Sequence, residues 1–250
     1  MISNGKFYES QFEEATIELL REAHWQYAFG DDIHRKYTDP LIEEDLRNFL
    51  AVQYKDKNLT TSEMDSIVAN LRNTGGQNDY YALRNTFLLY RDGYDFAYSD
   101  GRSNPFRLEY IDFEHPDHNI FRCVNQFVME QGRENRRPDI LLFINGIPVC
   151  IIELKNPTKQ NATIHDAHTQ ICTRYMRDIP ALLKYCALAV ISDGAKNALG
   201  ATYTPFEFFY EWKKIENEDK AGKGLDTLRT LIRGAISPER ILEILRDYVY

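Results

Sequence analysis

The stretch RPDILLFINGIPVCIIELKNPT, residues 137–158, contains two apolar runs joined by Asn145-Gly146, with charged residues only at their outer ends. An Asn-Gly pair between such runs is typical of a tight β-hairpin, because both residues adopt the positive φ that a type I′ turn requires. Asp139 begins the first run, and Glu153 and Lys155 end the second. The stretch therefore predicts a buried hairpin whose open end carries three charges.

The geometry of the turn decides whether these charges lie together. A two-residue loop without a bulge puts Asp139 opposite Ile152 and leaves Glu153 on the other face of the sheet. A three-residue loop, or a bulge elsewhere in either strand, puts Asp139, Glu153 and Lys155 on one face. The sequence leaves both geometries open.

Carboxylates that converge at a strand end suit Mg²⁺, which prefers oxygen ligands and keeps several waters. On one face, Asp139 and Glu153 would be metal ligands, and the carbonyl of Leu154 could be a third. Lys155 could orient or deprotonate a water, or stabilise the charge that the water attacks. The alternative is that Asp139 is a turn residue and the other two are solvated or paired strand-end charges.

The rest of the chain predicts an α/β fold, with a mixed sheet of about five strands flanked by helices and an added helical region near the N-terminus. Apolar spacing and capping signals predict helices over about 9–23, 61–73, 80–90 and 163–177, one opened by Asp39-Pro40 and one opened by Ser237-Pro238. Short β-branched and aromatic runs predict strands at 107–113, 121–129, 139–144, 147–155 and 187–192. A parallel pairing is open to the last of them, because a helix precedes it.

Composition restricts the classes of function. The 250 residues are 43% hydrophobic, enough for one large or two small domains, and the net charge of −8 argues against unaided binding to a polyanion. The four cysteines show no CxxC pairing, which favours reduced thiols in the cytoplasm over disulfides or a zinc site. No signal peptide or membrane-spanning run is expected.

The segment RPD…IIELK looks like the PD-(D/E)xK nuclease signature. With FEEATIELL (12–20), IDFEHPDHNIFRCVNQF (111–127), RYMRDIPALLKYCALAVISDG (174–194) and ERILEILRDY (239–248), it resembles the N-terminal nuclease region of the restriction (R) subunit of type I restriction–modification enzymes. The resemblance covers nearly the whole chain. It implies a restriction-endonuclease-like core in which Asp139 and Glu153 bind metal and Lys155 is catalytic.

The resemblance also implies a glutamine and a tyrosine on the helix after the lysine, written QxxxY. Here Gln170 and Tyr175 are five residues apart instead of four, which leaves their joint role open, because four-residue spacing shares a helix face more closely. An acidic residue of the first helix often completes such sites. Glu13 is the candidate, with Glu9 and Glu14 as competitors.

By the resemblance, the chain is one Mg²⁺-dependent DNA endonuclease domain over residues 1–250, with a helical insertion at about 25–105 and a helical lead at 225–250 into an ATP-driven motor. No GxxxxGK[ST] phosphate loop occurs in the 250 residues, so ATP would act only through that motor. The implied partners are double-stranded DNA, the motor domains, and the methyltransferase and specificity subunits. The alternatives are a repair or junction-resolving nuclease of the same superfamily, and a non-catalytic docking module.

Other residues suggest weaker sites. His165 and His168, like His115 and His118, are spaced for a metal, but without a third ligand nearby we expect them to be surface histidines. Basic residues flank the hairpin and could contact a phosphate backbone or simply be solvated. They are Arg133, Arg136, Arg137 and Lys159.

Overall fold

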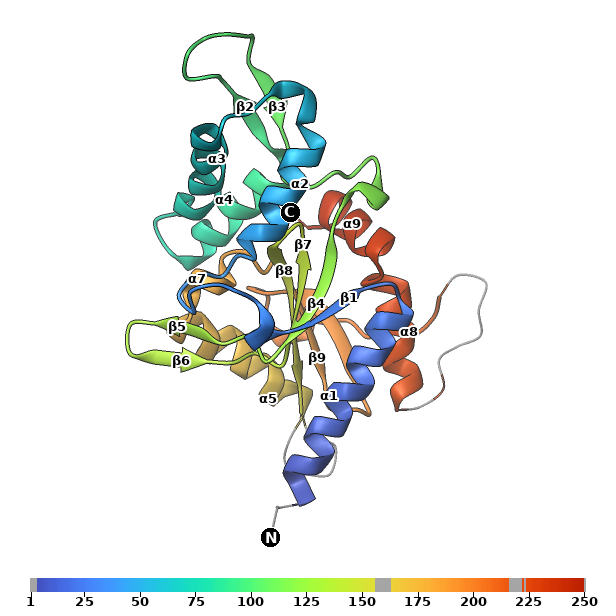
Figure 1. The fold of residues 1–250 in the computed structure, drawn as a ribbon. Coiled ribbons are helices and arrows are strands. Elements are labelled where there is room, and N and C mark those ends of the chain that lie inside the picture. The colour runs from blue at the N-terminus through green and yellow to red at the C-terminus, as the bar shows by residue number, and fades with distance from the viewer. Residues whose placement is uncertain (1–3, 156–162, 216–221, 223, 250) are drawn as a thin grey trace.

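A computed structural model describes residues 4–155, 163–215, 222 and 224–249, and for residues 4–9 only the backbone. Within these residues, six strands form a mixed sheet at the centre of the molecule (Figure 1). Their spatial order is β1 (Gln26–Phe29), β4 (Phe121–Asn125), β7 (Ile140–Ile144), β8 (Ile147–Leu154), β9 (Leu188–Ser192) and β10 (Asn197–Ala201). The pairs β1–β4 and β8–β9 are parallel and the others antiparallel. The predicted α/β class is confirmed.

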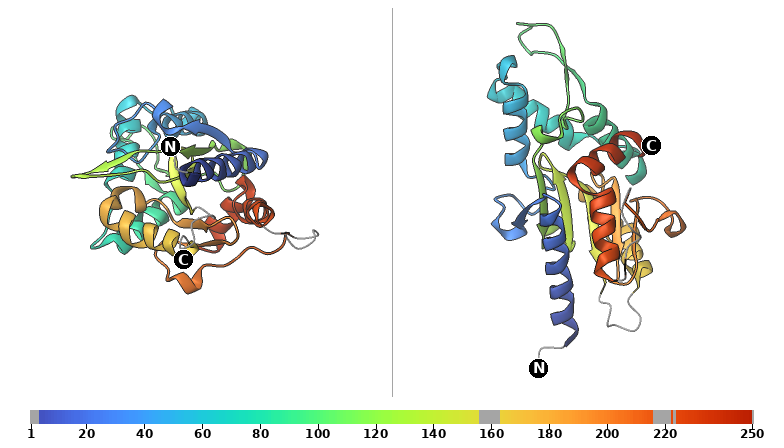
Figure 2. Two further views of the ribbon diagram at one scale, coloured as in Figure 1. Left: turned by 90° about the horizontal axis from the view of Figure 1, so that it is seen from below. Right: turned by 90° about the vertical axis from the view of Figure 1, so that its right-hand side faces the viewer.

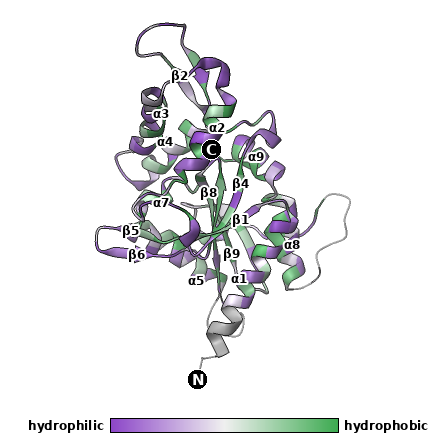
Figure 3. Ribbon diagram, in the orientation of Figure 1, coloured by the Kyte–Doolittle hydropathy of each residue, from purple (hydrophilic) through white to green (hydrophobic). Residues whose placement is uncertain are grey.

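Helices cover both faces of this sheet (Figure 2). Alternate strand residues such as Ile140, Leu142 and Ile152 pack in one cluster with α1 (Asn4–Glu22), α8 (Leu225–Ala235) and α9 (Pro238–Asp247). The residues between them, such as Leu141 and Ile151, pack with the second layer of helices. That layer consists of α5 (Ile164–Thr169), η4 (Gln170–Tyr175), α6 (Met176–Asp178) and α7 (Pro180–Leu183). Because both faces are covered here, the central strands β7, β8 and β9 are buried and mostly apolar along their length (Figure 3).

A helical region continues the first cluster beyond the β7–β8 turn (Figure 1). It contains α2 (Glu43–Gln53), α3 (Thr61–Asn73), α4 (Asp79–Asp92) and a small hairpin of β2 (Tyr94–Phe96) and β3 (Phe106–Leu108). A second small hairpin, β5 (Met129–Gln131) and β6 (Glu134–Arg136), follows β4. Short 3-10 turns lie at Gly30–Asp32, Lys55–Lys57, Pro116–His118 (η3) and Phe206–Phe208.

The β7–β8 turn combines a two-residue loop with a bulge. Asn145 and Gly146 have φ of 51° and 76°, as a type I′ turn requires, and Ile144 pairs with Ile147. The register then shifts, because Phe143 pairs with Pro148 but Leu142 with Cys150. Val149 is therefore the extra residue of a β-bulge.

The structure corrects several predicted boundaries near the sheet. Residues 109–113 are a loop instead of a strand, because the Asn119 side chain accepts the N–H of Asp112. The strand predicted at 121–129 ends at Asn125, because Gln126 has a φ of 55°. Strands β1 and β10 were not predicted. The region of the expected helical insertion at about 25–105 also contains two strands, since β1 belongs to the main sheet and β2 pairs with β3.

The helix predicted to open at Asp39-Pro40 begins later, at Glu43. Asp39 still accepts the N–H of Leu41 at 3.1 Å, as a capping residue would. However, Ile42 donates its N–H to the carbonyl of Gly146 at 2.9 Å and has a non-helical ψ of 82°. The contact with the hairpin turn therefore delays the helix. The other predicted helices lie within a few residues of their expected bounds.

Candidate active site at the open end of the hairpin

The bulge brings the predicted carboxylates to one face of the sheet. On the open-end side of Val149, Ile140 pairs with Ile152. Continued by one residue, this register puts Asp139, just before β7, opposite Glu153. Asp139 also contacts the end of β8 directly, because its Oδ2 accepts the N–H of Leu154 at 2.7 Å. Side chains directly opposite in an antiparallel pair point to the same face. The three-residue loop is excluded, and the bulge places the charges together.

Glu153 is a buried acid that no described donor fully satisfies. It is 1% exposed, and its Oε2 accepts no hydrogen bond from the described part of the chain. Burial first, and then the like charge of Asp139, raise the pKa of Glu153 to about 8, against the opposing effects of Lys155 and the Tyr175 hydroxyl. Burying a carboxylate with a free oxygen is costly, which is typical of functional sites.

Lys155 links Glu153 to the second layer of helices. Its Nζ donates to Glu153 Oε1 at 2.9 Å and to Gln170 Oε1 at 2.6 Å. Gln170 Nε2 in turn donates to the hydroxyl of Tyr175 at 2.7 Å. Burial, reinforced by the charge of Glu153, holds the pKa of Tyr175 well above its ordinary value, so this hydroxyl keeps its proton. The chain of contacts fixes the ammonium beside the carboxylate.

The five-residue spacing of Gln170 and Tyr175 is accommodated by a π-helical turn. The segment η4 is π-helical, with α-helix on both sides of it. A π turn contains about one more residue than an α turn, so residues five apart lie on one face. The two side chains are therefore brought together in spite of their five-residue spacing.

Glu13 of α1 lies beside the same site. A cleft of about 670 Å³ is lined by Glu13, Glu14, Arg137 and Asp139, among others. Gln126 donates to both carboxylate oxygens of Glu13 at 2.8 Å, and Asn125 donates to Oε1 at 2.7 Å. Glu14 lines the cleft but is exposed, and the side chain of Glu9 lies outside the described atoms. Of the three candidates, Glu13 is the one that the fold holds in place.

Sequence reasoning missed the residues that hold Glu13. Asn125 and Gln126 lie in a segment predicted to be a regular strand, so their side chains were not expected to converge. Tyr27, on the unpredicted strand β1, donates to Asn125 Oδ1 at 3.0 Å and lines the cleft. A polar Asn-Gln pair at the end of an apolar run was the signal in the sequence that could have marked this position.

The donor set of this site fits a hard cation. It offers the half-buried Asp139 carboxylate and the free Oε2 of Glu153, both oxygen ligands of the kind that Mg²⁺ prefers. Burial, and after it the nearby Asp139 carboxylate, raise the pKa of Glu153, and a bound cation would oppose both effects by stabilising the ionised form.

The flanking basic residues differ in their contacts. Arg136 pairs with Glu134 and with the buried Asp178, so it connects β6 to α6. Arg137 lines the cleft beside Asp139, and Arg133 is exposed. Lys159 lies outside the described residues. Arg137 is therefore the one of the described three that lies at the candidate site.

The two histidine pairs lie away from these carboxylates. His165 and His168 pack their rings against Phe206 at 5.0 and 5.6 Å, and His168 Nε2 contacts the carbonyl of Thr204 at 3.0 Å. His115 and His118 lie in the loop before β4, with their rings stacked 4.7 Å apart. A third potential ligand, Asp112, lies beside them, which the sequence analysis did not expect.

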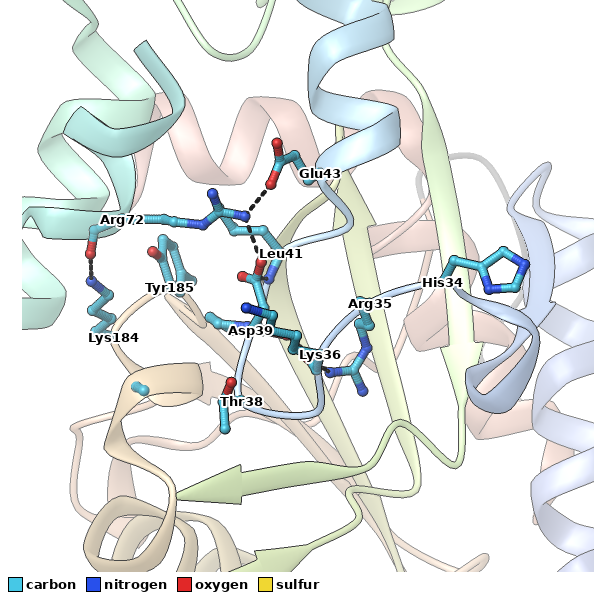
Figure 4. A pocket seen from close by; sticks show the side chains of 12 residues that line it. His34, Arg35, Lys36, Thr38, Asp39, Leu41, Glu43, Arg72, Lys184 and Tyr185 are labelled. Carbon is cyan, nitrogen blue, oxygen red and sulfur yellow. Dashed lines mark hydrogen bonds and ion pairs between the residues drawn. The ribbon is translucent and has the colours of Figure 1, made fainter. Parts of the chain in front are cut away.

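A second hollow, of about 570 Å³, lies between the segment before α2 and the α7 region (Figure 4). Several of its charged side chains are engaged within the protein. Arg72 pairs with Asp39 and Glu43, and Lys184 donates to the carbonyls of Arg72 and Thr74. These contacts connect α2, α3 and α7, so we interpret them as structural.

Comparison with known proteins shows the family of the chain. Residues 6–208 match the family described as "Type I restriction enzyme R protein N terminus". The chain is 31% identical to the HindI endonuclease subunit of a type I restriction enzyme from Haemophilus influenzae, over 96% of this chain and 24% of the relative. It is 28% identical to the putative MjaIXP endonuclease subunit from Methanocaldococcus jannaschii, over 95% of this chain and 25% of the relative.

The chain therefore belongs to the family of type I restriction enzyme R protein N-terminal regions. It spans about a quarter of the length of these two relatives. Within the described residues, no helix is long and apolar enough to cross a membrane.

Proposed function

We propose that this chain is a Mg²⁺-dependent DNA endonuclease domain that hydrolyses phosphodiester bonds. The observation that carries the proposal is the buried, unsatisfied Oε2 of Glu153 opposite Asp139, with the Lys155 ammonium on the other oxygen of Glu153. The family assignment, and relatives named as endonuclease subunits, favour this over a repair or junction-resolving nuclease.

Each residue has a role that follows from its contacts. Asp139 and Glu153 would hold the cation, which supplies Lewis-acid stabilisation of the charge that develops on the phosphate. Lys155, held by Gln170, is placed to orient a water or to stabilise that charge. Gln170 and Tyr175 position the ammonium and the Glu153 carboxylate. Glu13 closes the other side of the cleft, where Arg137 can contact the DNA backbone.

We further propose that the chain acts on unmodified foreign DNA as part of a larger complex. The net charge of −8 gives it little general affinity for DNA. Motor domains driven by ATP, with the methyltransferase and specificity subunits, would hold the DNA and select it. The relatives are named as subunits of type I restriction enzymes, which supports such an assembly. The four cysteines without CxxC pairing fit its location in the reducing cytoplasm.

The competing function is a docking module whose carboxylates are purely structural. In that case, the Lys155 pair would already satisfy Glu153, and added Mg²⁺ would not stabilise the fold. Ligands that bind only the native state raise its stability in proportion to RT ln(1 + [L]/Kd). The two functions therefore differ in a measurement that requires no DNA.

The decisive experiment is a thermal unfolding titration with Mg²⁺ on the wild type, Asp139→Ala and Glu153→Ala. The nuclease proposal predicts a rise in melting temperature for the wild type that both variants lose. Equal responses of all three proteins would contradict it. In the assembled restriction enzyme, Asp139→Ala, Glu153→Ala and Lys155→Ala should each abolish cleavage but leave ATP hydrolysis intact. Cleavage retained by any two of them would refute the assignment.

A further inference from the structure

The loop between β3 and β4 gathers three metal-ligating side chains away from the nuclease site. The Nδ1 atoms of His115 and His118 lie 3.3 and 3.0 Å from Asp112 Oδ2. Their ligand atoms all lie within 4.8 Å of one another. Asp112 is buried, with 4% of the residue exposed, whereas the side chains of His115 and His118 are 63% and 49% exposed. The site therefore combines a buried ligand with access to solvent.

These separations match those of a transition-metal site. In a tetrahedral zinc site with bonds of about 2.0–2.1 Å, neighbouring ligand atoms lie about 3.3 Å apart. The two nitrogen–oxygen distances already approach this value. We propose that Asp112, His115 and His118 form a binding site for Zn²⁺ or a similar borderline divalent ion, with the fourth position open to solvent. Two imidazoles and a carboxylate favour such ions over Mg²⁺.

Contacts around Asp112 fix its carboxylate for this purpose. Oδ1 accepts the N–H groups of Glu114 and His115 at 3.0 and 2.9 Å. Gln53, the last residue of α2, donates to Oδ2 at 3.1 Å. Hydrogen-bonded ligands of this kind have their orientation set before the metal binds. The arrangement therefore differs from two histidines that meet by chance at a surface.

The chain contains a matched pair for comparison. His165 and His168 have the same three-residue spacing, but their ring centroids lie 6.4 Å apart and His168 Nε2 contacts the carbonyl of Thr204. No acid of the described residues joins them in a potential metal group. Spacing alone therefore does not produce the cluster. The buried Asp112 is what distinguishes the two pairs.

The position of the cluster suggests a structural ion. Asn119 accepts the N–H of Asp112 and the amide of Asn145, so the loop is connected to the β7–β8 turn. This is the end of the hairpin opposite Asp139, about 25 Å away along the eight residues of β8. The turn η3 within the loop also packs against α9. A bound ion would stabilise this junction without entering the proposed nuclease chemistry.

The test is titration of the metal-free 250-residue chain with Co²⁺ and then Zn²⁺, in the Asp139→Ala background so that the candidate nuclease site is silenced. We expect one Co²⁺ per chain, with the intense visible bands of four-coordinate cobalt, no thiolate charge-transfer band, and displacement by Zn²⁺. His115→Gln/His118→Gln should lose this binding. His165→Gln/His168→Gln should retain it. Gln53→Ala, which leaves the three ligands in place, should weaken it by about 10- to 100-fold.

Two results would overturn the proposal. One is Co²⁺ binding that is equal in the two double histidine variants, which would show only adventitious binding. The other is an absence of saturable Co²⁺ or Zn²⁺ binding by a chain whose circular dichroism shows that it is folded. Because the ligands differ from those of the nuclease site, neither result depends on whether that site binds Mg²⁺.

Discussion

Gln170 Nε2 donates a 2.7 Å hydrogen bond to the Tyr175 hydroxyl, although the two residues are five positions apart along the helix. The π-helical turn η4 makes this contact possible, and its flanking residues continue as α-helix. One extra residue in an α-helix produces such a turn, and π turns are frequent at functional sites. Although the spacing departs from the QxxxY pattern, the π turn keeps the glutamine and tyrosine side chains in contact on one face of the helix.

Deleting the exposed Thr173 should convert η4 into an α-helical turn and leave Gln170 and Tyr175 in contact at four-residue spacing. We expect a melting temperature within a few degrees of the wild type and retained Mg²⁺-dependent stabilisation. The control is deletion of the exposed Arg84 from the regular helix α4, which rotates every later apolar residue of α4 off the core. If the Thr173 deletion is as destabilising as the Arg84 deletion, the π turn is not a removable insertion.

The β7–β8 turn contains a position, residue 146, where only glycine fits. Gly146 has positive φ, and a Cβ there would lie 2.1 Å from the carbonyl oxygen of Ile42. Gly146→Ala should therefore cost more than the roughly 1–2 kcal/mol of a left-handed L-residue alone. Gly132→Ala measures the cost of the left-handed backbone alone, because Gly132 has a φ of 62° and no atom lies within 4 Å of a Cβ placed there. Chemical denaturation should rank Gly146→Ala as clearly the more destabilised, and equal losses would contradict the steric argument.

The same hairpin shows how far the sequence could predict the site. Asn145-Gly146 identified the turn, and the charges at the strand ends identified Asp139, Glu153 and Lys155. The bulge was not predictable, because Val149 lies in the apolar run IPVCII, where every residue suits either face of a sheet covered on both sides. The burial of the Glu153 carboxylate itself was also out of reach, since it depends on how α1 and α5 pack against β8.

Glu13 offers a test of the cleft beside α1. Asn125 and Gln126 hold the carboxylate of Glu13 by hydrogen bonds. Glu14 lines the same cleft, but neither of these two residues bonds to its side chain. We expect Glu13→Gln to reduce DNA cleavage by the assembled enzyme, and Glu14→Gln to change it little. Gln126→Ala should act in the same direction as Glu13→Gln, since it releases the carboxylate. Full cleavage by both Glu13→Gln and Gln126→Ala would exclude this side of the cleft from the site.

The raised pKa of Glu153 makes the stability of the metal-free protein depend on pH. The unfolded chain ionises this acid above its ordinary pKa of 4.5, whereas the folded chain holds its proton until about pH 8. The folded state therefore binds more protons between these values, and its stability relative to the unfolded state falls as pH rises through that window. Glu153→Gln removes the titration, so its advantage over the wild type in chelator should grow between pH 5 and pH 8.5.

The measurement is the melting temperature of both proteins across that range, with Glu18→Gln as the exposed control. Added Mg²⁺ should reverse the order at pH 8.5, because a cation stabilises the ionised carboxylate of the wild type but has no ionised Glu153 to bind in the variant. The burial of Glu153 thus has two effects: it destabilises the ionised, metal-free protein at high pH, and it favours binding of a cation beside the carboxylate. A pH-independent difference between wild type and Glu153→Gln would show that Glu153 titrates normally, and it would remove the electrostatic basis of the candidate metal site.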